Sequence, residues 1–299
     1  SSSGNTVFDA IRNTLSQVNE KLYFHHLQVL VISEEIAQKS IMDALDFMLR
    51  DQEGEPMAKL LVAKGCKASE VIQARSDIED IPAMHLISIL ENSKSLPFIR
   101  EIDLFEILKS LEQDGVEPVV GVVTKVSEKE ELNIKDLRFT EAAVFKGDKL
   151  VGWLDASETR GFLFVEGELV SGILNIDNPL DNGKKVSIEM TRSSAKKDIV
   201  LHNDGGLGIL IEIYMEGDIG NKQGTGNLTS EEVIPKLQFQ LEKLIENEVR
   251  HTVELAQNVY KSDIFGFGEI VRKSYPQYWE EISDWNEIFS GLPLELKVV

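Results

Sequence analysis

Cysteine, aromatic residues and long apolar runs are all scarce in this sequence. Cys66 is the only cysteine among 299 residues, which rules out an internal disulfide, and aromatic residues make up only 7% of the chain. A lone thiol with no acid–base partner nearby in the sequence is typical of a small buried hydrophobic residue. No apolar run approaches the roughly 20 residues that a membrane-spanning helix requires. The sequence therefore predicts neither a disulfide framework nor a membrane-spanning helix.

Basic residues are also few relative to acidic ones. The chain has 31 Lys and Arg against 51 Asp and Glu, and its formal net charge is −20. A nucleic-acid partner would need a basic stripe, and direct adhesion to anionic lipid depends on Lys and Arg, each contributing about 1 kcal/mol. The charge balance argues against both partners. It predicts either an ordinary acidic, solvated surface or a surface matched to a basic partner.

The first part of the chain, residues 1–128, alternates strand and helix patterns. Strand-length apolar runs occur at Leu27–Ile32, Met57–Ala63 and Glu117–Val126. Apolar residues at helical spacing predict the helices that lie before and between these runs, at Thr6–Glu20, from Ser40 onward, and at Ser69–Arg75, Ala83–Asn92 and Asp103–Gln113. Such an alternation favours an α/β layer with partly parallel strands.

A charged stretch, Ser127–Lys135, separates this part from a hairpin pattern. Strands are expected at Arg138–Phe145 and Lys149–Trp153, joined by a tight turn that contains a glycine. Asp155 and Glu158 have the spacing of a capping box, which predicts the start of a short helix. A further strand is expected over residues 168–176.

The last part of the chain begins at the turn-rich segment Asn178–Gly183. Period-2 alternation predicts three strands, at Lys184–Arg192, Lys196–His202 and Gly208–Glu216. A polar, glycine-rich loop, a helix and a final strand should follow, at Gly217–Asn227, Thr229–Lys261 and Leu294–Val299; Thr229 with Glu232 should cap that helix, and Pro235 should lie near its first turn.

These patterns predict a mixed α+β protein with three domains. A hydrophobic content of 42% is enough to form globular cores. The expected domains are an N-terminal α/β layer (1–128), a small hairpin–helix domain (129–177) and a C-terminal domain (178–299) in which an antiparallel sheet packs with a long helix.

The sequence offers no recognisable catalytic, cofactor-binding or metal site. Gly266-x-Gly268 lacks the third glycine of the dinucleotide fingerprint and follows a helix. Gly205-Gly206-x-Gly208 lies between two strands, so it predicts a hairpin turn. Asp177–Gly183 lacks calcium-loop spacing. The five histidines form no metal-binding pair; they are His25, His26, His85, His202 and His251. We expect no cofactor and no enzymatic activity.

The segment Asp263–Phe289 concentrates the large aromatic residues of the chain. Its alternation of phenylalanine and glycine indicates close packing, because glycine lets helices approach while the rings fill a core. Five side chains are predicted to pack within the C-terminal domain: Trp153, Phe265, Phe267, Trp279 and Trp285. Arg160 is the candidate for a specific polar contact with a partner; the alternative is a salt bridge inside the domain.

Several of these segments resemble a known family. EAAVFKGDKLVGWLDASETRGFLFVEGEL (Glu141–Leu169) resembles the stretch of Ger(x)C spore germination proteins in which a hairpin ends in G-W-L and leads into E-T-R-G. DIFGFGEIVRKSYPQYWEEISDW (Asp263–Trp285) is similar to the family's other signature. Thr6–Asn13, Leu22–Ala37 and Asp46–Glu53 also resemble it, so the likeness covers nearly the whole chain.

The resemblance implies a non-enzymatic role in spore germination. Members of this family are the C subunits of nutrient germinant receptors. They are exported, lipidated on an N-terminal cysteine and held at the outer surface of the spore inner membrane, where they work with two integral membrane subunits. The printed sequence begins Ser-Ser-Ser-Gly-Asn and contains neither a signal segment nor that cysteine. Membrane attachment is therefore implied by the resemblance and not by these residues.

Two other functions stay open at this point. One is an extracytoplasmic module that itself binds a small nutrient, which would need a concave pocket with a few convergent polar groups. The other is a hydrolase whose site is assembled from separate loops. The sequence assigns residues to neither.

Overall fold

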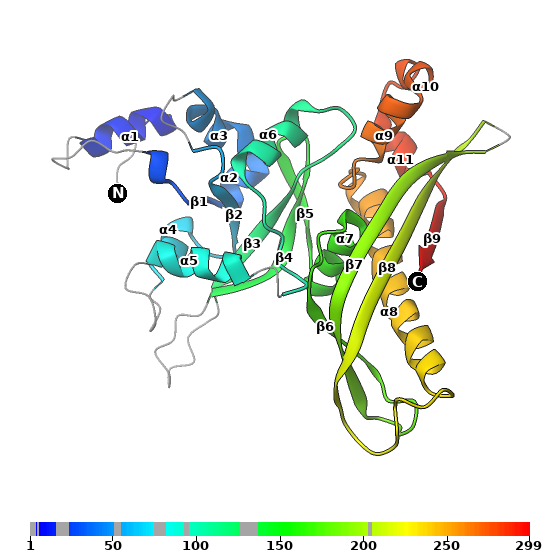
Figure 1. The fold of residues 1–299 in the computed structure, drawn as a ribbon. Coiled ribbons are helices and arrows are strands. Elements are labelled where there is room, and N and C mark those ends of the chain that lie inside the picture. Colours follow the sequence, from blue (N-terminus) through cyan, green and yellow to red (C-terminus); the bar gives the residue numbers. More distant parts are fainter. Residues whose placement is uncertain are drawn as a thin grey trace.

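The structure is a computed structural model of the whole chain. It describes residue 4 and residues 6–15, 24–50, 55–74, 82–92, 96–125, 137–202 and 205–299. Two sheets, one five-stranded and one four-stranded, stand side by side and each is packed with helices (Figure 1). The protein is thus a mixed α+β protein, as the sequence predicts.

The first sheet combines parallel and antiparallel pairing. Its strand order follows the chain from β1 to β5. The first three strands pair in parallel and the last two in antiparallel fashion. Their bounds are β1 (Val29–Ser33), β2 (Lys59–Lys64), β3 (Val119–Lys125), β4 (Leu137–Lys146) and β5 (Lys149–Leu154). The buried parallel strands explain the near-continuous apolar runs in the sequence.

Helices cover both faces of this sheet. One face packs against α2, α3 and α6, and the other packs against α4 and α5. The helices of this part are α1 (Val7–Leu15), α2 (Glu34–Lys39), α3 (Ile41–Arg50), α4 (Ala68–Ile72), α5 (Pro82–Glu91) and α6 (Leu104–Glu112), with a 3-10 turn at Phe24–His26. The predicted boundary segment Ser127–Lys135 lies outside the described residues.

The second sheet is built on one very long hairpin. Its order is β6-β7-β8-β9, with β9 parallel to β8 and the other pairs antiparallel. The strands are β6 (Gly172–Asp177), β7 (Lys185–Leu201), β8 (Leu207–Lys222) and β9 (Leu294–Val298). The turn between β7 and β8 contains Gly205 at positive φ, as the glycine pattern predicts.

The hairpin differs from the sequence prediction in two ways. The expected strands Lys184–Arg192 and Lys196–His202 are one strand, because Ser193, Ser194 and Ala195 between them pair with Met215, Tyr214 and Ile213 of β8. β8 extends to Lys222, so half of the expected loop Gly217–Asn227 is strand. Cross-strand hydrogen bonds hold polar and glycine residues in these two strands, although the intrinsic strand preference of such residues is low.

The long helix α8 (Ile234–Glu254) packs on the second sheet. It continues into a π-helical turn, Leu255–Tyr260. The predicted cap formed by Thr229 and Glu232 is wrong, because the N-cap is Val233 and Pro235 occupies the first turn. The remaining helices are α7 (Ala156–Glu166), α9 (Phe267–Ser274), α10 (Pro276–Glu280) and α11 (Trp285–Ser290). None of the described helices is both long and apolar enough to cross a bilayer.

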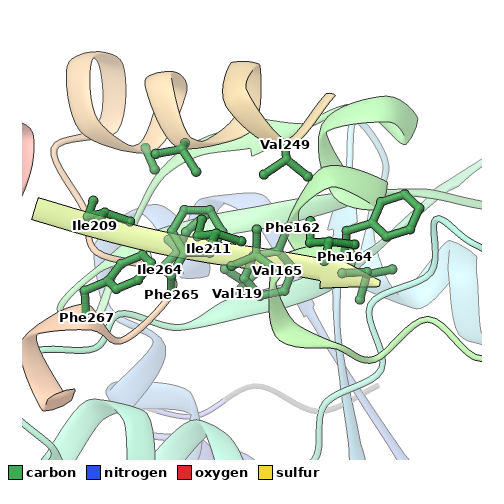
Figure 2. Packing of buried hydrophobic residues seen from close by; sticks show 14 of the residues in the cluster. Val119, Phe162, Phe164, Val165, Ile209, Ile211, Val249, Ile264, Phe265 and Phe267 are labelled. Atoms are coloured by element: carbon green, nitrogen blue, oxygen red, sulfur yellow. The ribbon is translucent and has the colours of Figure 1, made fainter. Parts of the chain in front are cut away.

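The described part of the predicted middle segment (129–177), residues 137–177, forms no separate sheet. Its hairpin β4–β5 completes the first sheet, while β6 is the first strand of the second. One buried cluster joins the two halves: it includes Val119 of β3, Phe162 of α7 and Ile209 of β8 (Figure 2). The middle segment therefore connects the two sheets, and its helix α7 lies in the core between them.

Candidate functional site: the buried junction between the two sheets

Helix α7 lies at the centre of this junction and begins with the predicted capping box. The Asp155 carboxylate accepts hydrogen bonds from the backbone N–H groups of Ser157 (2.8 Å) and Glu158 (2.9 Å). The Glu158 carboxylate in turn accepts from the Asp155 N–H at 2.7 Å. The two carboxylates together satisfy N–H groups that a helix start leaves unpaired.

The next two residues, Thr159 and Arg160, bind α7 to its neighbours. Thr159 is buried, and its hydroxyl donates to the Leu154 carbonyl at 3.3 Å. The Arg160 guanidinium binds both carboxylate oxygens of Glu248 on α8, with Nε–Oε2 at 2.8 Å. This is the internal salt bridge that the sequence left as an alternative, and it occupies the side chain that was the candidate for a partner contact.

Gly161 permits the close approach of α7 and α8. A Cβ atom at this position would overlap the Thr252 hydroxyl and lie 2.7 Å from the Glu248 carbonyl oxygen. Both obstacles belong to a helix that cannot shift without disturbing the Arg160 ion pair. The motif Glu158–Gly161 is therefore a helix–helix contact motif.

Replacing Gly161 with alanine should destabilise the protein by about 1–3 kcal/mol, because the added methyl group forces α7 and α8 apart. Urea denaturation of the purified chain would measure the loss. Gly147→Ala is the control. No atom lies within 4 Å of a Cβ at that position, so the added methyl group causes no clash and the only cost comes from the positive φ. An alanine at residue 161 that leaves stability unchanged would contradict the packing role.

The hairpin residues Gly152 and Trp153 contact Tyr260, at the end of the π-helical turn that follows α8. The Tyr260 hydroxyl donates to the Trp153 carbonyl at 2.6 Å, and a Cβ at Gly152 would overlap the Tyr260 ring. The Trp153 side chain, however, packs against the core of the first sheet, with Lys64 Nζ 4.7 Å from its ring centroid. The expectation that Trp153 packs within the C-terminal domain is wrong, because β5 belongs to the first sheet.

Asp263 is the buried polar centre of the junction. It is fully buried, and its carboxylate accepts hydrogen bonds from Trp285 Nε1 (2.7 Å), the Gly268 N–H (2.8 Å) and the Phe265 N–H (3.2 Å). A Cβ at Gly268 would lie 2.6 Å from both Trp285 Nε1 and Gly115 Cα. The glycine is needed for this close contact.

Two further residues extend the polar network to the first sheet. The Asp263 N–H donates to Asn286 Oδ1 at 3.0 Å, and Asn286 Nδ2 donates to Glu117 Oε1 at 2.8 Å. Glu117 precedes β3, and its other oxygen accepts from the Gly147 N–H at 2.5 Å. The network therefore runs from the β4–β5 turn to α11, and it links the first sheet to the segment that contains α9 and α11.

Burial raises the pKa of two carboxyls in this network. Desolvation raises the pKa of Asp263 from 3.8 to about 6, although hydrogen bonds to the carboxylate oppose the change. Desolvation also raises the pKa of Glu117, against the hydrogen bonds from Asn286 and Gly147. Asp263 and Glu117 therefore favour the protonated form more than a solvated carboxyl does.

The raised pKa of Asp263 predicts a pH-dependent stability. Since the folded-state pKa lies above the ordinary value of 3.8, the folded protein holds the proton more tightly than the unfolded chain. The stabilisation is complete below about pH 3.8 and is lost as pH rises through about 6. The shift in pKa between the unfolded and folded states corresponds to about 3 kcal/mol in the free energy of unfolding.

Asp263→Asn gives the test, because the amide does not titrate. Stability measured by urea denaturation from pH 4.5 to 7.5 should fall less steeply in the variant than in the original chain. Glu117 remains in both proteins and so does not account for a difference. Parallel curves would show that Asp263 has the same pKa in the folded and unfolded states.

Sequence reasoning located the aromatic core but missed its polar partners. Phe265, Phe267 and Trp285 are buried together, as predicted, and Trp279 is only partly buried, 5.7 Å from Trp285 between ring centroids. Asp263 had one local signal, an acidic residue directly before an apolar–glycine run. Asn286 and Glu117 had none, because they are distant in the sequence from each other and from Asp263.

The described residues show no arrangement suited to a metal. No three His, Cys, Asp or Glu side chains of the described ranges are grouped so that they could hold a metal ion. An open hollow of about 380 Å³ does lie beside the junction, between residues 96–106 and residues 163–171. Its lining mixes leucine and valine with charged groups that include Lys59 and Arg100.

Known proteins share this sequence and fold. Residues 140–299 match the family described as "Spore germination B3/ GerAC like, C-terminal", and residues 1–125 match "Spore germination protein N-terminal domain". Spore germination protein KC of Bacillus subtilis (strain 168) is 27% identical over 98% of this chain and 75% of its own length. Spore germination protein B3 of the same organism is 24% identical over 97% and 76%.

A solved structure shares the fold. The crystal structure of the GerBC protein superposes with a TM-score of 0.72 at 20% identity, covering 97% of this chain and 83% of the other. The signature segments that suggested the family, Glu141–Leu169 and Asp263–Trp285, are the two segments that meet at the junction described above. Their glycines, aromatic rings and capping residues are its packing elements. The chain belongs to the GerAC-like family of spore germination proteins.

Proposed function

We propose that this chain is a non-enzymatic subunit of a nutrient germinant receptor and acts in spore germination by assembling with two integral membrane subunits. The observation that supports this most directly is the family match over both parts of the chain. The signature residues serve as packing and capping groups at a buried junction, which suits a protein that presents surfaces to partners.

A lipid anchor outside the printed sequence is part of the proposal. In this proposal the subunit lies at the outer surface of the spore inner membrane, as the family resemblance implies. A single acyl chain holds a protein to a bilayer only marginally, so stable attachment needs a second signal or bound partners. With a net charge of −20, the chain itself supplies little attraction to anionic lipid. Binding to integral membrane subunits would provide the second attachment.

Residue-specific crosslinking in spores tests the proposal. A photo-crosslinking amino acid would be placed at exposed positions on each part of the chain, for example at Phe105 and Phe239. Crosslinks to integral membrane proteins at a subset of positions, and loss of the nutrient response when the gene is deleted, are the expected results. Spores that lack the chain and respond normally to every nutrient would overturn the proposal.

A small-molecule role is the second candidate, and it rests on the hollow beside the junction. The hollow of about 380 Å³ has the size of a small ligand site, and its lining combines apolar side chains with both charge signs. Calorimetry of the purified chain with individual nutrients would separate the two functions. Micromolar binding that Arg100→Ala weakens would support the second function, and absence of heat with all nutrients would exclude it.

A further inference from the structure

The strand β9 forms an open edge of the second sheet. It is the last strand in the sheet order, and Figure 1 shows it at the outer side of β8. The Ile209 N–H donates to the Pro293 carbonyl, and the Val299 N–H donates to the Ile213 carbonyl. In this parallel register the odd-numbered residues of β9 bond to β8. The backbone groups of Leu294, Leu296 and Val298 therefore point away from the sheet.

The side chains of β9 alternate between two environments. Leu294, Leu296 and Val298 are partly buried and pack against the core beneath α8. Glu295 and Lys297 are exposed on the opposite face. Lys297 makes one exposed ion pair, to Glu212 at 3.8 Å, which leaves it free to share a second carboxylate.

We propose that β9 pairs in antiparallel fashion with β9 of a second copy of this chain, around a two-fold axis at Leu296. In that register Glu295 of each copy lies opposite Lys297 of the other, so two attractive charge pairs form by symmetry. Leu294 lies opposite Val298 on the apolar face, and the outward N–H and C=O groups of Leu296 bond to their equivalents. The strand is thus complementary to itself in charge, in apolar contacts and in hydrogen bonding.

The other three strands that end the two sheets lack this property. β1 (Val29–Ser33) contains no charged residue, and β5 (Lys149–Leu154) contains only a lysine at its start. β6 (Gly172–Asp177) has one acidic residue at its end, already paired with Lys185 at 2.7 Å. Pairing any of these strands with itself would bring no opposite charges together. Among the four strands that end the described sheets, β9 is the one whose own sequence places opposite charges across a symmetric pairing.

The small area of the β9–β9 contact limits the affinity of the dimer. A pairing of five residues buries well under the ~1,200 Å² of a standard stable interface. We therefore expect a reversible dimer with a dissociation constant on the order of 100 µM in free solution. This inference does not rest on the proposed receptor function, because it concerns only the edge of the sheet.

Charge exchange gives the decisive experiment. The full 299-residue chain would be studied by sedimentation equilibrium up to millimolar concentration at low salt, together with the variants Glu295→Lys, Lys297→Glu and the double exchange. Each single variant places like charges opposite each other twice, so dimerisation should weaken roughly tenfold. The double exchange restores both attractive pairs and should recover it. Lys196→Glu, a charge reversal on β7, should have no effect.

Two results would overturn the proposal. One is a chain that stays monomeric over the whole concentration range. The other is a dimer in which the double exchange behaves like the single variants, because a different surface would then be responsible. Thermal unfolding monitored by circular dichroism shows that each variant is folded; Glu212 loses its ion pair in Lys297→Glu but not in Glu295→Lys, so the latter reports on pairing alone.

Discussion

Phe267→Ala should lower the free energy of unfolding by about 3–5 kcal/mol. Phe267 is fully buried. Its ring centroid lies 6.0 Å from that of Phe265 and 6.3 Å from that of Phe289, in a stacked arrangement with the latter. Removing the ring leaves a cavity where the first turn of α9 meets the core that joins both sheets. Urea denaturation followed by tryptophan fluorescence would measure the loss.

Two further variants make this test specific. Phe239→Ala removes a ring that is 59% exposed on α8, and its effect should stay within about 0.5 kcal/mol. Trp279→Ala should fall between the two, because that side chain is only partly buried. If Phe267→Ala costs no more than Phe239→Ala, the ring does not hold the core together.

Asp263→Ala should be the second severe variant, with a loss of about 3 kcal/mol or more at pH 5. The substitution leaves the N–H groups of Trp285, Gly268 and Phe265 buried without an acceptor, and each such group costs about 1–3 kcal/mol. The loss should be smaller at pH 7.5, since the original protein then carries a buried charge that the variant lacks. Urea denaturation at the two pH values would measure both.

A second variant compares the loss of a buried acceptor with the loss of an exposed one. Asp284→Ala removes a carboxylate that caps α11 through one bond to the Glu287 N–H at 3.3 Å. The loss of that exposed cap should cost about 1 kcal/mol at either pH. Equal effects of Asp263→Ala and Asp284→Ala would mean that Asp263 acts as no more than a local cap.

Features with short-range causes could be predicted from the sequence. Asp155 and Glu158 form their capping box because both partners lie within one helical turn. The β4–β5 hairpin, the strand Leu294–Val298 and the burial of Phe265 and Phe267 also follow from spacing and composition. The family resemblance rests on these same local segments, and the comparisons confirm it.

Features that depend on distant partners could not be predicted. Trp153 lies on β5, and the sheet that β5 joins depends on its pairing partner β4. The packing of Trp153 against the core of the first sheet therefore could not be predicted from nearby residues. The length of β7 depends on β8, because β8 pairs with the residues between the two strands that the sequence predicts, where the pattern indicates an interruption.

By itself the sequence determined the family, the mixed fold class, the positions of most helices and strands, and the residues that fill the aromatic core. It also determined the scarcity of basic groups that argues against nucleic acid. Only the tertiary structure decided that the middle segment joins two sheets, and that Asp263, Asn286 and Glu117 meet there. The physical reason is range: capping and periodicity act within a few residues, whereas a buried carboxyl finds its partners only when separate segments fold together.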